Sequence, residues 1–126
     1  MKDVKFYICE TCGKVIQIVE EKRVPTICCG KPMVELVAGT VDASREKHIP
    51  VITVEGNTVK AVVGSVLHPM AEEHHIAWIY LETDKGGQMK YLDFNTDPVI
   101  TFTLGDEKAV AVYAYCNLHG LWKTEL

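Results

Sequence analysis

The chain of 126 residues has a formal net charge of −4, with 48% hydrophobic and 24% charged residues. This balance is typical of a globular protein with one domain, or one domain and a small module. The charge argues against general nucleic-acid binding, which relies on dense basic contacts to phosphate. No apolar stretch approaches the roughly 20 residues that cross a bilayer, so we expect no membrane segment. The N-terminus lacks the apolar core of a signal peptide, so we expect a cytoplasmic protein.

The cysteines form two close pairs and one isolated residue: Cys9 with Cys12, Cys28 with Cys29, and Cys116. An odd count in a reducing compartment disfavours a disulfide framework. The first four cysteines predict a small module, residues 1–37, which is too short to bury a sufficient apolar core by itself. A metal bound by four thiolates would supply the missing stability.

The adjacent pair Cys28 and Cys29 constrains the backbone of this module. Neighbouring side chains on an extended strand point to opposite faces, so the chain must turn there if both are to reach one ion. We expect a tetrahedral site with one distorted sulfur–metal–sulfur angle. Thiolates suit both zinc and iron, and the spacing alone slightly favours structural zinc over an electron-transfer Fe(Cys)4 centre. A vicinal disulfide is a third alternative.

The remaining residues, 38–126, form the second predicted domain. It begins with a polar connection within residues 37–48. Runs rich in β-branched and aromatic residues then alternate with turn signals: 51–54, 58–63, 75–83, 88–94, 99–104 and 109–115. This pattern predicts an antiparallel sandwich or barrel.

The second cluster of candidate metal ligands lies in this domain. Cys116-x2-His119 brings a thiolate and an imidazole to one turn, and further histidines lie upstream: His48, His68 and His74. If all converge, four nitrogens and one sulfur leave one octahedral position open for a small molecule. Strand alternation does not decide between His74 and the adjacent His75, because both strand faces are apolar.

The donor set also bears on the metal. Zinc needs no fifth ligand and has no redox chemistry. A blue-copper site would use a weak axial methionine, which in that family follows the cysteine and histidine, and here no methionine follows Met89. Iron therefore fits best. Glu46 and Lys47 precede the first histidine; such a pair is usually a solvated surface, but beside an open position the lysine would attract a small anion.

In this order and combination, the motifs resemble those of desulfoferrodoxins, the two-domain superoxide reductases. The motifs are Cys9-x2-Cys12 with Cys28-Cys29, Glu46-Lys47-His48-x-Pro50, His68-Pro69-Met70-x3-His74, and Cys116-Asn117-Leu118-His119-Gly120. The resemblance covers essentially the whole chain.

The resemblance implies a desulforedoxin-like module followed by an immunoglobulin-like β-sandwich, which makes the chain all-β. It implies iron bound by the four clustered cysteines, and a second iron with one axial thiolate, Cys116, and four equatorial imidazoles: His48, His68, His74 and His119. The family pattern thus selects His74 over His75. It assigns catalytic roles to Glu46, as a ligand of the ferric resting state, and to Lys47, in superoxide binding.

The implied reaction is one-electron reduction of superoxide to hydrogen peroxide. A rubredoxin-like donor would reduce the iron again, and the protein would be a homodimer. A two-iron electron carrier without superoxide chemistry is the alternative function, and a zinc-stabilised binding module is a third.

Overall fold

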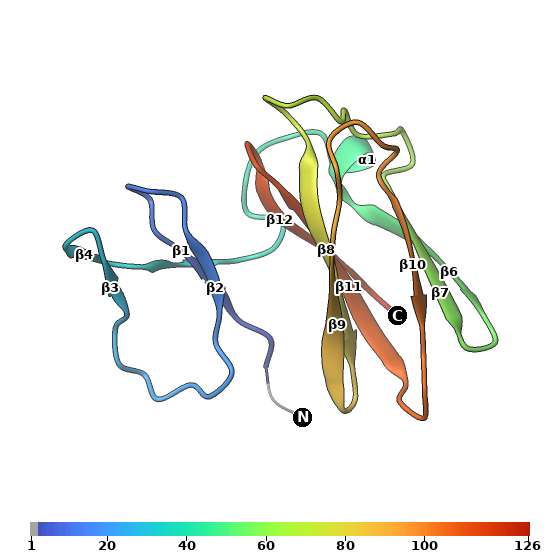
Figure 1. The fold of residues 1–126 in the computed structure, drawn as a ribbon, viewed down its shortest axis with the longest axis horizontal. Coiled ribbons are helices and arrows are strands. Elements are labelled where there is room, and N and C mark those ends of the chain that lie inside the picture. The colour runs from blue at the N-terminus through green and yellow to red at the C-terminus, as the bar shows by residue number, and fades with distance from the viewer. Residues whose placement is uncertain (1–2) are drawn as a thin grey trace. The chain divides into compact units, whose positions relative to one another are not determined.

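The computed structural model describes residues 3–126 and separates into two compact units, Met1–Val37 and Ala38–Leu126 (Figure 1). Within the described residues the only helix is the single turn α1, Arg45–His48. No helix in that part of the chain has the length and apolarity needed to span a membrane.

The first unit contains five very short strands. β1 (Phe6–Ile8) lies between β2 (Val15–Gln17) and β5 (Val34–Leu36), and β3 (Ile27–Cys28) pairs with β4 (Lys31–Pro32). Its buried apolar side chains are Phe6, Cys9 and Met33, whereas Val19, Val24 and Ile27 are exposed. This core is too small to hold the unit together through apolar burial alone.

The second unit is a sandwich of two antiparallel sheets. One has the order β10-β7-β6 and the other β12-β11-β8-β9 (Figure 1). The strands are β6 (Pro50–Glu55), β7 (Thr58–Val63), β8 (Ile76–Thr83), β9 (Gly86–Tyr91), β10 (Val99–Thr103), β11 (Ala109–Cys116) and β12 (Gly120–Glu125). The predicted all-β architecture is confirmed.

Alternation along the strands builds the core between these sheets. Val59, Ala61 and Val63 of β7 are fully buried, and they pack in one cluster with side chains from the opposing sheet. Val112, Ala114 and Cys116 of β11 follow the same period of two, so Cys116 is the last inward-facing residue of its strand. The register of β11 against β8 shifts between Tyr115 and Cys116, a β-bulge of the kind often found beside functional sites.

The structure differs from the sequence-based assignment in three details. The run 88–94 is β9 shifted to Gly86–Tyr91, because Gly87 pairs closely with β8: a Cβ atom there would lie 2.0 Å from the Tyr80 hydroxyl. The connection 37–48 ends in a helical turn, α1. The final strand, β12, is absent from the sequence-based expectations.

Candidate metal centres

The four cysteines of the first unit converge. Their sulfur atoms all lie within 4.8 Å of one another, and the Sγ atoms of Cys12 and Cys28 are 3.7 Å apart. All five cysteines of the chain are free thiols, which removes the vicinal disulfide. The predicted four-sulfur donor set is therefore present.

A tight hairpin lets adjacent cysteines face the same point. Cys29 and Gly30 are the two residues between β3 and β4, and both have positive φ, 52° and 75°. Two consecutive positive φ angles are what a type I′ hairpin turn requires. The expected turn between Cys28 and Cys29 is confirmed, and its cost is a left-handed conformation at a non-glycine residue.

Main-chain amides already favour thiolate in this cluster. The Cys12 N–H donates to the Cys9 sulfur at 3.5 Å, and this bond is the main reason that the Cys9 pKa falls to about 6. Hydrogen bonds with Cys9 and Cys12 raise the pKa of the Cys28 thiol to about 12. Four neighbouring thiolates repel one another, so a cation at their centre is needed for all four to ionise.

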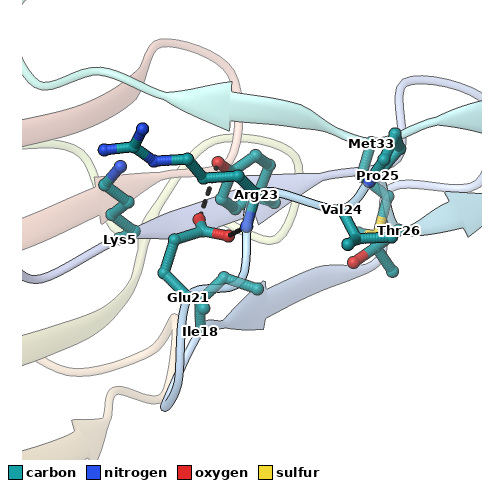
Figure 2. Close-up of a pocket in the computed structure, with 9 residues that line it drawn as sticks. Lys5, Ile18, Glu21, Arg23, Val24, Pro25, Thr26 and Met33 are labelled. Carbon is teal, nitrogen blue, oxygen red and sulfur yellow. Dashed lines mark hydrogen bonds between the residues drawn. The ribbon is translucent and has the colours of Figure 1, made fainter.

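The same unit has a separate hollow lined by polar and apolar side chains (Figure 2). Glu21, one of the residues that line it, accepts hydrogen bonds from the Arg23 backbone N–H, at 2.7 Å, and from the Tyr7 hydroxyl, at 3.4 Å. The first bond holds Arg23 at φ 58° and is the main reason that the Glu21 pKa is lowered. Glu21 therefore stabilises the loop between β2 and β3.

The second cluster lies at one end of the sandwich. Donor atoms of His48, His68, His74 and Cys116 lie within 4.8 Å of one another. The Nδ1 atom of His119 lies 3.2 Å from His48 Nε2 and 3.7 Å from Cys116 Sγ. The five predicted donors are brought together, although they come from segments up to 71 residues apart.

Strand ends and short turns position these donors. His48 closes α1, His68 follows β7, and His74 immediately precedes His75 and β8. Cys116 ends β11, and His119 lies in the turn to β12, where Cys116 pairs with Gly120. His48, His68 and Cys116 are almost completely buried, with 3%, 2% and 0% exposure.

Main-chain carbonyls orient two of the imidazoles. The Nδ1 atoms of His48 and His68 lie at hydrogen-bonding distance from the carbonyls of Ser44 and Pro69, which leaves their Nε2 atoms facing each other at 3.2 Å. Trp122 adds a second support: its ring stacks on His48 at 4.9 Å, and its Nε1 donates to the His119 carbonyl at 3.1 Å. Sequence spacing carried no signal for these supporting residues.

The protonation of the imidazoles suits a bound cation. Burial lowers the pKa of His68 to about 4 and lowers the pKa of His48 and His74 as well, so the imidazoles are neutral and can ligate. Burial raises the Cys116 pKa, against the backbone N–H groups of Leu118 and His119. The Nε2 atom of His74 is buried without a hydrogen-bond partner. An orphaned buried nitrogen on a member of this donor cluster is what a metal ligand would show before its ion is added.

His75 lies apart from this cluster. Its Nδ1 atom is 3.0 Å from the carbonyls of Ala71 and Glu72, and its ring lies 6.0 Å from that of Phe94. Of the two adjacent histidines, the structure places only His74 among the donors.

Glu46 and Lys47 are exposed residues of α1 next to the buried His48. The positive charge of Lys47 contributes to the lowered pKa of both His48 and His74, so the ammonium lies within electrostatic range of the centre. The Glu46 carbonyl accepts hydrogen bonds from Val66 N–H at 3.0 Å and from the Ser65 hydroxyl at 3.2 Å. Their main chain is thus anchored while their side chains face solvent.

Comparison with known proteins covers both units. Residues 2–36 match the family "Desulfoferrodoxin, N-terminal domain", and residues 40–125 match "Desulfoferrodoxin". The chain is 41% identical to a desulfoferrodoxin homolog of Archaeoglobus fulgidus over 96% of each chain. It is also 41% identical to the desulfoferrodoxin of Nitratidesulfovibrio vulgaris, over 96% of this chain and 95% of that one.

Among solved structures, the superoxide reductase of Treponema pallidum superposes with a TM-score of 0.83 at 38% identity. The match covers 98% of this chain and 100% of that one. These relationships, together with the two donor clusters, confirm the resemblance read from the motifs. The chain belongs to the desulfoferrodoxin family.

Proposed function

We propose that this oxidoreductase is a superoxide reductase with two irons per chain, one held by the four cysteines and the reactive one by His48, His68, His74, His119 and Cys116. The observation that carries the proposal is the convergence of four imidazoles and one thiol, with His48, His68 and Cys116 buried and one imidazole nitrogen left unpartnered. Ferrous iron would supply the single electron that turns superoxide into hydrogen peroxide once two protons are added.

Lys47 would attract the substrate. Superoxide is an anion and the chain has a net charge of −4, so the approach needs a local positive field. Lys47 is exposed on α1, next to the candidate ligand His48, so its ammonium would supply that field. The same ammonium would serve as a proton donor, directly or through water. Glu46, on the same exposed turn, would ligate the oxidised iron after turnover.

Cys116 would provide the thiolate donor. Its sulfur is completely buried and receives the His119 N–H at 3.4 Å, so it is shielded from water and held in place by a main-chain donor. A thiolate is an electron-rich donor, as described for haem thiolates, so Cys116 would hold the iron and supply it with electron density.

We also propose a rubredoxin-like electron donor and a homodimer. Both follow from the family resemblance, and the exposed valines of the first unit, Val19, Val24 and Val34, offer apolar surface to a second copy. A cytoplasmic location accords with five free cysteines, which persist in reducing compartments.

The test is pulse-generated superoxide mixed with the reduced, iron-loaded protein. We expect a second-order reaction that slows with added salt and yields hydrogen peroxide; a two-iron electron carrier would show no such fast step. Lys47→Ala should slow the reaction about tenfold at low salt and flatten its salt dependence, since steering by local charge changes association rates by roughly 10-fold or more. Lys60→Ala, an exposed lysine of β7, is the matched control. An unchanged rate in Lys47→Ala would remove its steering role.

A further inference from the structure

We propose that Asn117 is a positioning residue that fixes His74 in the donor cluster. Asn117 lies between Cys116 and His119 in the chain, yet its side chain reaches the segment around His74. Its Oδ1 accepts the His75 N–H at 2.8 Å, and its Nδ2 donates to the Glu73 carbonyl at 3.1 Å. Its own N–H donates to the His75 carbonyl at 3.2 Å. The residues on both sides of His74 are therefore tied to one asparagine.

His74 needs this external support more than the two buried histidines do. The rings of His48 and His68 are each oriented by a main-chain carbonyl at Nδ1, whereas among the described residues no carbonyl holds the His74 ring in this way. The segment that carries it is an irregular turn, closed by mutual hydrogen bonds between Ala71 and His74 at 2.9 and 3.2 Å. These bonds shape the turn but do not attach it to the other ligands.

The loop that carries Asn117, between Cys116 and His119, is already held in place. Cys116 pairs with Gly120 in the β11–β12 hairpin, and Trp122 holds the carbonyl of His119. Asn117 therefore sits on a fixed loop and holds a less regular one. Residues that orient metal ligands without touching the metal commonly change metal affinity by about 10- to 100-fold when mutated. Since the Asn117 side chain is exposed, its truncation removes two hydrogen bonds without opening a core cavity.

The experiment measures iron release from the histidine-containing centre into excess chelator, with the four-cysteine absorption followed as an internal reference. Asn117→Ala should release that iron about tenfold faster than the wild type. Asn117→Asp keeps the acceptor for the His75 N–H, so its iron release rate should lie between those of the wild type and Asn117→Ala. Asn57→Ala, an exposed asparagine in the β6–β7 turn, should release iron at the wild-type rate.

A double-mutant cycle separates positioning from general stability. If Asn117 acts through His74, Asn117→Ala should change the release rate less than twofold in a His74→Ala background, yet keep its tenfold effect in a His48→Ala background. Equal effects in both backgrounds, or wild-type release from Asn117→Ala and Asn117→Asp, would overturn the inference. It rests on the proposed iron centre but not on superoxide reduction: a protein that holds iron without reducing superoxide would contradict only the proposed function.

Discussion

The two donor clusters differ in what surrounds them. In the small unit, Cys12 and Cys29 are exposed, and the buried apolar side chains nearby are few. In the sandwich, His48, His68 and Cys116 are buried, and Cys116 belongs to the main apolar core. The small unit thus depends on its ion for structure, whereas the sandwich has a core of its own and can hold a metal for chemistry.

Breaking the four-cysteine cluster should give the largest effect. Cys28→Ser should unfold residues 3–37 while the sandwich stays folded, because structural metal sites contribute folding free energy of about 10 kcal/mol or more. Amide signals of the two units in a two-dimensional NMR spectrum measure this separately. Cys116→Ser is the matched control in the other cluster and should leave both sets dispersed. Retained dispersion of the small unit in metal-free Cys28→Ser would show that its apolar core suffices.

Substitution of Cys116 in the sandwich cluster should change the metal centre without unfolding the domain. Cys116→Ser keeps the size of a side chain with 0% exposure, so the fold should survive. The sulfur-to-iron charge-transfer absorption of this centre should disappear completely, because its only sulfur is gone. A visible spectrum of the oxidised protein measures this, and persistence of the band would show that Cys116 is not the ligand.

Gly64→Ala should produce a smaller, local effect. A Cβ at Gly64 would lie 2.5 Å from the Glu46 carbonyl oxygen and 3.1 Å from that of Ile49, so α1 would have to move. Overpacking of this kind costs about 1–3 kcal/mol, which urea denaturation would detect. Gly105→Ala, where the nearest atom is 3.7 Å away, is the control and should cost much less. Equal stability of the two variants would contradict the tight contact.

Acid should weaken the metal-free sandwich by a modest amount. The pKa of His68 is about 4 in the folded state and near 6.5 in an unfolded chain, so between these values only the unfolded chain takes up the proton. The free energy of unfolding should therefore fall as the pH drops from 6.5 towards 4. Both tryptophans, Trp78 and Trp122, lie in the sandwich, so their fluorescence reports its denaturation alone. His68→Gln should reduce this slope, and an unchanged slope would remove the contribution of His68.

The donors were predictable because soft metal sites use cysteine and histidine, and because several of these residues are closely spaced in the sequence, as in Cys9-x2-Cys12 and Cys116-x2-His119. The two-layer fold followed from β-type runs separated by turn signals. The supporting contacts were not predictable: nothing in the sequence shows that Trp122 stacks on His48 or that Gly64 makes room for Glu46. These contacts join segments far apart in the chain, and their side chains carry no ligand signature. The start of β9 was not predicted, because glycines usually mark turns, although Gly87 is required beside Tyr80.

The comparison between the two clusters is tested most directly by single-turnover oxidation of the fully reduced, iron-loaded protein with superoxide. We expect the histidine-containing iron to be oxidised first, with one hydrogen peroxide formed per superoxide and no dioxygen released. Simultaneous oxidation of the four-cysteine iron, or release of dioxygen with half that yield of peroxide, would contradict it.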